Sequence, residues 1–281
     1  MTSFGPRYLT IVLSLFLVAG CKGSEASKNE AASNKAGSQA ASATAKDDDK
    51  STVPGTVDPD AVAALARMSA YLTSLKTAQI KSNGSLDVVT QDGQRIQMDG
   101  VTNYKLRKPA GFVIDYDSDL KKRRFYYDGK QFTVYAPSTG FYSTVPAPAT
   151  NKDTLKEIYE KRGIKLPLED LFRWSDPNGK RDDALKSAYQ VGTATIDGVP
   201  TDHYAFREAN TDWEVWIQQG AQPLPRKLVI VDQTDAAHPT YIARLDWKVN
   251  PALAASDFTF APNADAKRIP MATYIASGES K

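Results

Sequence analysis

The chain has 281 residues, with 35 lysines and arginines against 33 aspartates and glutamates, and a formal net charge of +2. This balance lacks the basic excess with which proteins bind nucleic acid, so we expect no nucleic-acid partner. Cys21 is the only cysteine, which excludes a disulfide within the chain and a metal site built from several thiolates.

The N-terminal segment has the pattern of a bacterial lipoprotein signal peptide. Arg7 precedes an apolar run from Leu9 to Gly20, which is too short for a membrane span of about 20 residues. The run ends in Val18-Ala19-Gly20-Cys21, which resembles a lipobox. We therefore expect residues 1–20 to be removed and Cys21 to become a lipidated amino terminus. The alternative is a buried apolar strand with an ordinary core cysteine, but a polar tract follows at once.

Residues 21–57 are predicted to form a lipidated, disordered tether. They are rich in Ala, Ser, Lys, Asn and Asp and contain no aromatic residue, so they cannot bury enough apolar surface to offset the entropy of ordering. Lys22 follows the cysteine, where an aspartate often retains lipoproteins in the inner membrane of Gram-negative bacteria. The prediction is a protein anchored in the bacterial envelope and facing the periplasm, in the outer membrane rather than the inner one.

The folded domain is expected over residues 58–281 and begins with a helix. Asp58 is suited to the N-cap and Pro59 to the first helical position. Apolar residues then recur every three or four positions to about residue 77, which indicates an amphipathic helix. These residues are Val62, Leu65, Met68, Leu72 and Leu75.

The hydrophobic period then changes to two, which is typical of half-buried strands. Asp-Gly pairs at 92–93, 128–129 and 197–198 predict type I′ hairpin turns. The fold class is therefore α+β with an antiparallel meander. The predicted strands cover residues 86–90, 95–98, 112–116, 124–127, 131–135, 192–196, 203–206, 213–217, 228–231 and 241–249.

A helical insert separates two groups of strands. Thr150 and Asp153 resemble a capping box, and Gly163 is a stop signal for the helix between them. Residues 166–174 predict a second short helix and 177–188 a third. The apolar stripe of the first consists of Leu155, Ile158 and Tyr159.

In this order the elements resemble the LolA/LolB-type lipoprotein-sorting superfamily, and most closely an uncharacterised branch of predicted periplasmic proteins within it. The resemblance covers roughly residues 60–270. It is carried by Tyr104-Lys105-Leu106-Arg107-Lys108-Pro109, Phe112-Val113-Ile114-Asp115-Tyr116, Tyr127-Asp128-Gly129-Lys130-Gln131-Phe132-Thr133-Val134-Tyr135, Ile196-Asp197-Gly198-Val199 with Tyr204, and Asp257-Phe258-Thr259-Phe260-Ala261-Pro262.

The resemblance implies an incomplete antiparallel β-barrel, a half-barrel whose concave face is covered by helices and takes acyl chains. The same scaffold serves as an envelope stress sensor and as a lipid carrier. The insert is longer and more charged than in the sorting factors, and no apolar loop protrudes as in LolB. Hydrophobic ligand binding is therefore expected, while these two departures weaken the case for specific delivery of lipoproteins.

Aromatic and aliphatic residues on one face of the strands are the candidate lining of a ligand cavity. The same inward pattern would also suit a solid core, and the sequence does not separate the two interpretations. The candidates in the strands are Phe112, Ile114, Tyr116, Phe132, Val134, Trp213, Val215, Leu245 and Trp247. The candidates in the insert, which would act as a lid, are Leu155, Ile158, Tyr159, Leu171 and Phe172.

Signals for catalysis are absent from the sequence. There is no Gly-x-Ser-x-Gly, no His-Glu-x-x-His and no glycine-rich nucleotide loop. His203 beside Asp202 would serve as a general base, but without a nucleophile motif a structural strand histidine is favoured. His238 lies in a polar loop. We expect no enzyme, no cofactor and no metal site.

The basic run Lys121–Arg124 has two interpretations. It would contact anionic headgroups at about 1 kcal/mol per charge, or it is an exposed hairpin entry whose charges discourage pairing at a sheet edge. The second is favoured.

The sequence thus predicts a lipid-anchored envelope protein that binds a hydrophobic ligand such as an acyl chain, in the manner of a lipid or lipoprotein carrier. The alternative is a protein-interaction or stress-sensing module that engages an envelope protein partner through the same groove.

Overall fold

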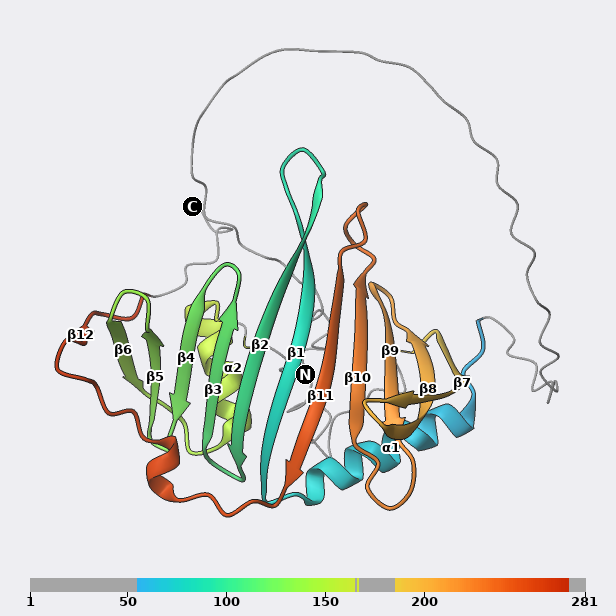
Figure 1. Ribbon diagram of the computed structural model, residues 1–281, viewed down its shortest axis with the longest axis horizontal. Helices are drawn as coiled ribbons and strands as arrows, with labels where there is room; N and C mark the ends of the chain where they lie inside the picture. Colours follow the sequence, from blue (N-terminus) through green and yellow to red (C-terminus); the bar gives the residue numbers. More distant parts are fainter. Residues whose placement is uncertain (1–54, 165, 167–184, 273–281) are drawn as a thin grey trace, which may run out of the picture.

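The computed structural model describes residues 55–164, 166 and 185–272 (Figure 1). Three residues with predicted roles, Cys21, Leu171 and Phe172, lie outside the described residues. The same holds for almost all of the predicted tether and of the helix predicted over 166–174. The lipidation and domain boundaries therefore stay predictions. Within the described part of the chain, neither α-helix is long and apolar enough to cross a membrane.

A single 12-stranded sheet forms the body of the protein. Its order is β12-β6-β5-β4-β3-β2-β1-β11-β10-β9-β8-β7, and all neighbours are antiparallel except β12, which runs parallel to β6. The strands are β1 (Thr77–Val89), β2 (Arg95–Arg107), β3 (Phe112–Ser118), β4 (Lys122–Tyr127), β5 (Gln131–Ala136), β6 (Phe141–Pro146), β7 (Ser187–Ile196), β8 (Val199–Arg207), β9 (Thr211–Gln218), β10 (Pro225–Asp232), β11 (Thr240–Val249) and β12 (Lys267–Arg268).

The sheet does not close on itself, because β12 and β7 stand at opposite ends of the order. Strand β1 is at its centre, with β2–β6 following on one side and β11–β7 on the other (Figure 1). The predicted α+β class with an incomplete antiparallel barrel is confirmed. A short 3-10 helix (Ala255–Phe258) precedes β12.

Helix α1 (Pro59–Ser74) begins where the sequence predicts. The Asp58 side chain accepts a hydrogen bond from the Asp60 amide at 2.9 Å, and Pro59 occupies the first turn. Main-chain bonds from Asp58 N to Ala188 O and from Ala188 N to Thr56 O fix the start of α1 to β7. The predicted stripe is buried against the sheet, and its buried residues are Ala61, Ala64, Leu65, Met68 and Leu72.

Helix α2 (Asn151–Arg162) also has its predicted limits. Thr150 accepts from the Asp153 amide at 3.1 Å and donates its hydroxyl to the Asp153 carboxylate at 2.7 Å. Gly163 ends the helix with a φ of 63°, the left-handed conformation that favours glycine. Caps are local signals, and for this reason both ends could be predicted.

Three expectations about the elements need correction. The type I′ turn occurs at Asp197-Gly198, where both residues have positive φ, but at 92–93 and 128–129 only the glycine does. Strands β1 and β2 are 13 residues each, far longer than the predicted pair of 86–90 and 95–98. The helix suggested over 177–188 is wrong at its end, because Ser187 and Ala188 already pair with β8.

Candidate ligand-binding face

The strand registers place every predicted lining residue of the strands on one side of the sheet, here called the inner face. Ile114 pairs with Tyr104 on β2 and with Phe125 on β4, and Phe125 pairs with Val134 on β5. On the other half, Trp247 pairs with Ile80 of β1, and Val215 of β9 pairs with Leu228 of β10. The period-two pattern therefore corresponds to apolar residues on one face in both halves of the sheet.

Most of this surface is buried. Phe112, Ile114, Phe132 and Val215 are 0% exposed, and Trp213 and Leu245 nearly so. Tyr116, Val134 and Trp247 are half-buried. The rings of Phe112 and Tyr127 lie 5.2 Å apart and those of Phe125 and Phe132 are stacked at 6.3 Å. The structure thus groups these residues, while their role as a ligand lining stays a prediction.

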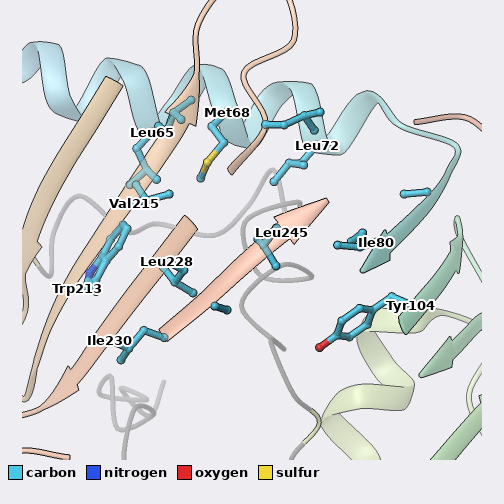
Figure 2. Packing of buried hydrophobic residues seen from close by; sticks show 14 of the residues in the cluster. Leu65, Met68, Leu72, Ile80, Tyr104, Trp213, Val215, Leu228, Ile230 and Leu245 are labelled. Atoms are coloured by element: carbon cyan, nitrogen blue, oxygen red, sulfur yellow. The ribbon is translucent and has the colours of Figure 1, made fainter. Parts of the chain in front are cut away.

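The two α-helices pack on the inner face at different places. Figure 2 shows Leu65, Met68 and Leu72 of α1 directed toward the strands that carry Val215 and Leu245. Helix α2 lies behind β3 and β4 in Figure 1, and its Ile158 belongs to the same buried cluster. Leu155 and Tyr159, also predicted as lining, are half-buried.

Asn151, in the first turn of α2, fixes this helix to the sheet and was not indicated by the sequence. Its side chain accepts from the Gly111 amide at 2.8 Å and donates to the Arg107 carbonyl at 2.9 Å. The main-chain N–H of Asn151 donates to the Pro109 carbonyl at 2.9 Å. Asn151 is 9% exposed, so these bonds are shielded from water and hold α2 on the turn between β2 and β3.

A group of hydroxyl side chains interrupts the apolar inner face near its centre; we call it the central hydroxyl cluster. It consists of Ser82, Thr102, Tyr104, Tyr116 and Tyr241. Ser82 and Thr102 pair across β1 and β2, and Thr102 pairs with Tyr116 of β3. Burial raises the pKa of the Tyr104 phenol well above its ordinary value, and nearby Tyr241 and Tyr116 raise it further. Of its members only Tyr116 was a predicted lining residue, because an apolar period-two pattern gives no signal at serine and threonine.

A cavity of about 250 Å³ lies on the opposite, outer face, beside β4–β6 and the C-terminal segment. Phe260 packs there against Tyr126, Tyr135 and Tyr142 with ring centroids 5.0–5.3 Å apart. None of the predicted lining residues that the structure describes borders this cavity. Its lining is Tyr126, Asp128, Gln131, Thr133, Tyr142, Thr144, Phe258, Thr259, Phe260, Pro262 and Arg268.

His203 is built into the outer face of β8–β10. Its ring stacks on Trp216 at 3.8 Å, its Nε2 lies 2.7 Å from the Glu214 carboxylate, and the Lys227 ammonium lies 4.0 Å from the centre of the Trp216 ring. Burial lowers the pKa of His203, and the bond to Glu214 opposes this shift. These contacts are those of a structural strand histidine. No group of three His, Cys, Asp or Glu residues within the described chain is arranged to hold a metal ion.

The basic run Lys121–Arg124 is partly neutralised. Lys122 pairs with Asp117 at 2.7 Å and Arg124 with Asp115 at 3.1 Å. The run does enter the β3–β4 hairpin with Lys121 and Lys122 exposed, as the favoured interpretation expects. Its protection of a sheet edge is wrong, because β4 lies between β3 and β5 in the interior of the sheet. The ion pairs also weaken the headgroup interpretation.

Comparisons with solved structures found proteins of low sequence identity. An uncharacterised conserved protein from Thermus thermophilus has 11% identity and a TM-score of 0.43, over 75% of this chain and 99% of that one. The lipoprotein LppX of Mycobacterium tuberculosis has 14% identity and a TM-score of 0.43, over 70% and 99%. A LolA superfamily protein from Nitrosomonas europaea has 10% identity and a TM-score of 0.36, over 71% and 97%.

The comparison with curated proteins found no match. A family model, described as predicted periplasmic protein (DUF2092), matches residues 61–272. This range contains α2, the 12 strands of the described sheet, and all of α1 except its first two residues. The match confirms the resemblance to an uncharacterised branch of predicted periplasmic proteins. The chain therefore belongs to the DUF2092 family of predicted periplasmic proteins.

Proposed function

We propose that this protein is a lipid-anchored envelope protein that binds an acyl chain on the inner face of its open sheet. The observation that carries the proposal is the extent of the inner face from β5 across β1 to β9, apolar on both sides of the central hydroxyl cluster, with α1 and α2 packed at different places along it. A ligand chain lying between these helices would leave water for apolar surroundings, which is worth about 0.8 kcal/mol per buried methylene.

The geometry also supports a way for the chain to enter. Helix α2 is attached to the sheet at its N-terminal end, through Asn151 and through the Tyr127 hydroxyl, which donates to Pro148 O in the preceding segment. Its C-terminal end is connected through Arg162, which donates to the Met271 and Ala272 carbonyls at 3.3 Å. Movement of α2 about the Asn151 end would open the inner face, so α2 would act as a lid.

The experiment is native mass spectrometry of the full mature protein ejected directly from vesicles of its bacterial envelope, so that no detergent competes with the ligand. We expect a bound species whose mass is that of an acyl lipid, and displacement of a fluorescent fatty acid such as cis-parinaric acid by that lipid. The absence of both a lipid adduct and parinaric acid binding would overturn the proposal. A stoichiometric protein partner bound to lipid-free protein would favour the interaction-module alternative.

A matched pair of variants locates the binding. Val134 is half-buried on the inner face of β5, and Val113 is half-buried on the outer face of β3. We expect Val134→Glu to lower parinaric acid affinity at least tenfold, because an unpaired carboxylate disfavours an apolar chain. Val113→Glu should leave it unchanged. Circular dichroism must show that both variants are folded, and equal effects of the two would contradict binding on the inner face.

We also propose that Cys21 carries the membrane anchor. The motivation is the apolar run and the Val18-Ala19-Gly20-Cys21 junction. Cys21→Ser should give an unprocessed precursor, or a product without lipid mass that is no longer retained in the membrane fraction. A variant with normal mass and membrane retention would show that the anchor lies elsewhere.

A further inference from the structure

The central hydroxyl cluster holds a polar atom without a partner. The Ser82 side chain is 1% exposed, and its Oγ has no hydrogen-bond partner among the described residues. Buried hydroxyl groups in proteins are nearly always hydrogen-bonded, and leaving one unpaired is costly. Ser82 also faces the same side of the sheet as Ile80 and Leu245, where an acyl chain would lie. Its hydroxyl is therefore directed toward the ligand surface rather than toward the outer face.

Two glycines lie next to Ser82 and Thr102 on the inner face. Gly84 and Gly100 pair across β1 and β2, two residues along from Ser82 and Thr102. A Cβ on Gly84 would lie 3.2 Å from the Tyr241 hydroxyl, and one on Gly100 would lie 3.5 Å from the Tyr116 ring. The two tyrosine rings thus lie over the Gly84–Gly100 row, which is next to the Ser82–Thr102 row on the inner face. The glycines allow these rings to come down against the sheet, and the Tyr241 and Tyr116 phenols lie near that of Tyr104.

The chemistry of the cluster selects the polar group that it would bind. Its members are neutral hydroxyls, and the raised pKa of Tyr104 keeps that phenol protonated. The cationic residue of this row is Arg123 on β4, which pairs with Tyr116 and therefore stands three strands away from Ser82 on β1. A buried carboxylate would require a cation within the cluster. A neutral carbonyl requires only hydroxyl donors, which Ser82 and its neighbours supply.

We infer that the central hydroxyl cluster binds the carbonyl of an ester-linked acyl chain, so that the ligand is a neutral acyl ester rather than a free fatty acid. This inference rests on the proposed function and narrows its ligand class. The ester carbonyl would accept a hydrogen bond from the Ser82 hydroxyl, and the hydrocarbon would extend from there over the apolar residues on either side.

The test compares monomyristin, myristic acid and tetradecane as competitors of a fluorescent acyl probe on the full mature protein. Wild type should bind monomyristin at least about fivefold more tightly than myristic acid, in line with one additional hydrogen bond. Ser82→Ala should lower the affinity for monomyristin by about the same factor and leave the affinity for myristic acid unchanged. Thr102→Val, which keeps the shape of the side chain, should act in the same direction.

Ser85→Ala is the matched control. Ser85 is a second serine on β1 whose Oγ is buried and unpartnered among the described residues, but it faces the outer side of the sheet. Monomyristin affinity should not change in this variant. The inference would be overturned if the wild type bound the acid as tightly as the ester or more tightly, or if Ser82→Ala had no effect. Either result would leave the proposed binding of an acyl chain intact. If none of the compounds displaces the probe and the probe itself does not bind, the proposed function fails as well.

Discussion

Replacing Phe112 with alanine lowers the free energy of unfolding by about 3–5 kcal/mol, as expected for removal of a fully buried aromatic side chain. Phe112 is 0% exposed on the inner face, and its ring lies 5.2 Å from that of Tyr127 and 6.2 Å from that of Phe132. The cavity left behind would border strands β3–β5, and these strands cannot collapse without losing their register. Chemical denaturation followed by circular dichroism measures the loss.

The matched control is Phe141→Ala. Phe141 starts β6 and is 40% exposed, so the same change of atoms removes much less buried surface. We expect its effect to stay within about 1 kcal/mol. A loss at Phe112 as small as that at Phe141 would show that the inner face is not a packed surface at this position.

Replacing Asn151 with alanine lowers the free energy of unfolding by about 2–4 kcal/mol, because it leaves two buried main-chain groups unpaired. These groups are the Gly111 amide and the Arg107 carbonyl, which bond to the Asn151 side chain at 2.8 and 2.9 Å. The loss of these bonds also frees the start of α2 from the sheet. Denaturant unfolding measures the stability, and hydrogen exchange of the α2 amides should increase.

Asn83→Ala is the control for this prediction. Asn83 lies in β1 with an exposed side chain, so its replacement should change stability by about 0.5 kcal/mol or less. Equal effects at the two positions, or unchanged exchange in α2, would contradict the role of Asn151 as the attachment of the helix.

The features predicted best from the sequence are those that depend on neighbouring residues. The caps Asp58, Thr150 and Gly163 act within one helical turn, and the helices begin and end beside them. Alternation in β3, β9 and β11 likewise identified the inner-facing residues, because a strand that is buried on one side must alternate. The Asp197-Gly198 turn was predicted correctly for the same local reason.

The features that were missed depend on contacts between distant segments. Gly84, Gly100, Ser82 and Thr102 break the apolar alternation of β1 and β2, so the length of these strands could not be predicted. The structure tolerates these small residues because tyrosine rings from β3 and β11 cover the two glycines. Asn151 has no sequence signal either, since a polar residue in the first turn of a helix is common and its partners lie about 40 residues away.

The central claim is that an acyl chain occupies the inner face, and photo-crosslinking tests it most directly. The full mature protein would be irradiated with a fatty-acyl ester that carries a diazirine in its chain, and the labelled peptides would be sequenced by mass spectrometry. We predict labels on the half-buried inner-facing residues of β3, β5 and β11, Tyr116, Val134 and Trp247, which an excess of unlabelled monomyristin removes. Labels confined to the outer face around Tyr126 and Phe260, or no label that monomyristin displaces, would contradict the account.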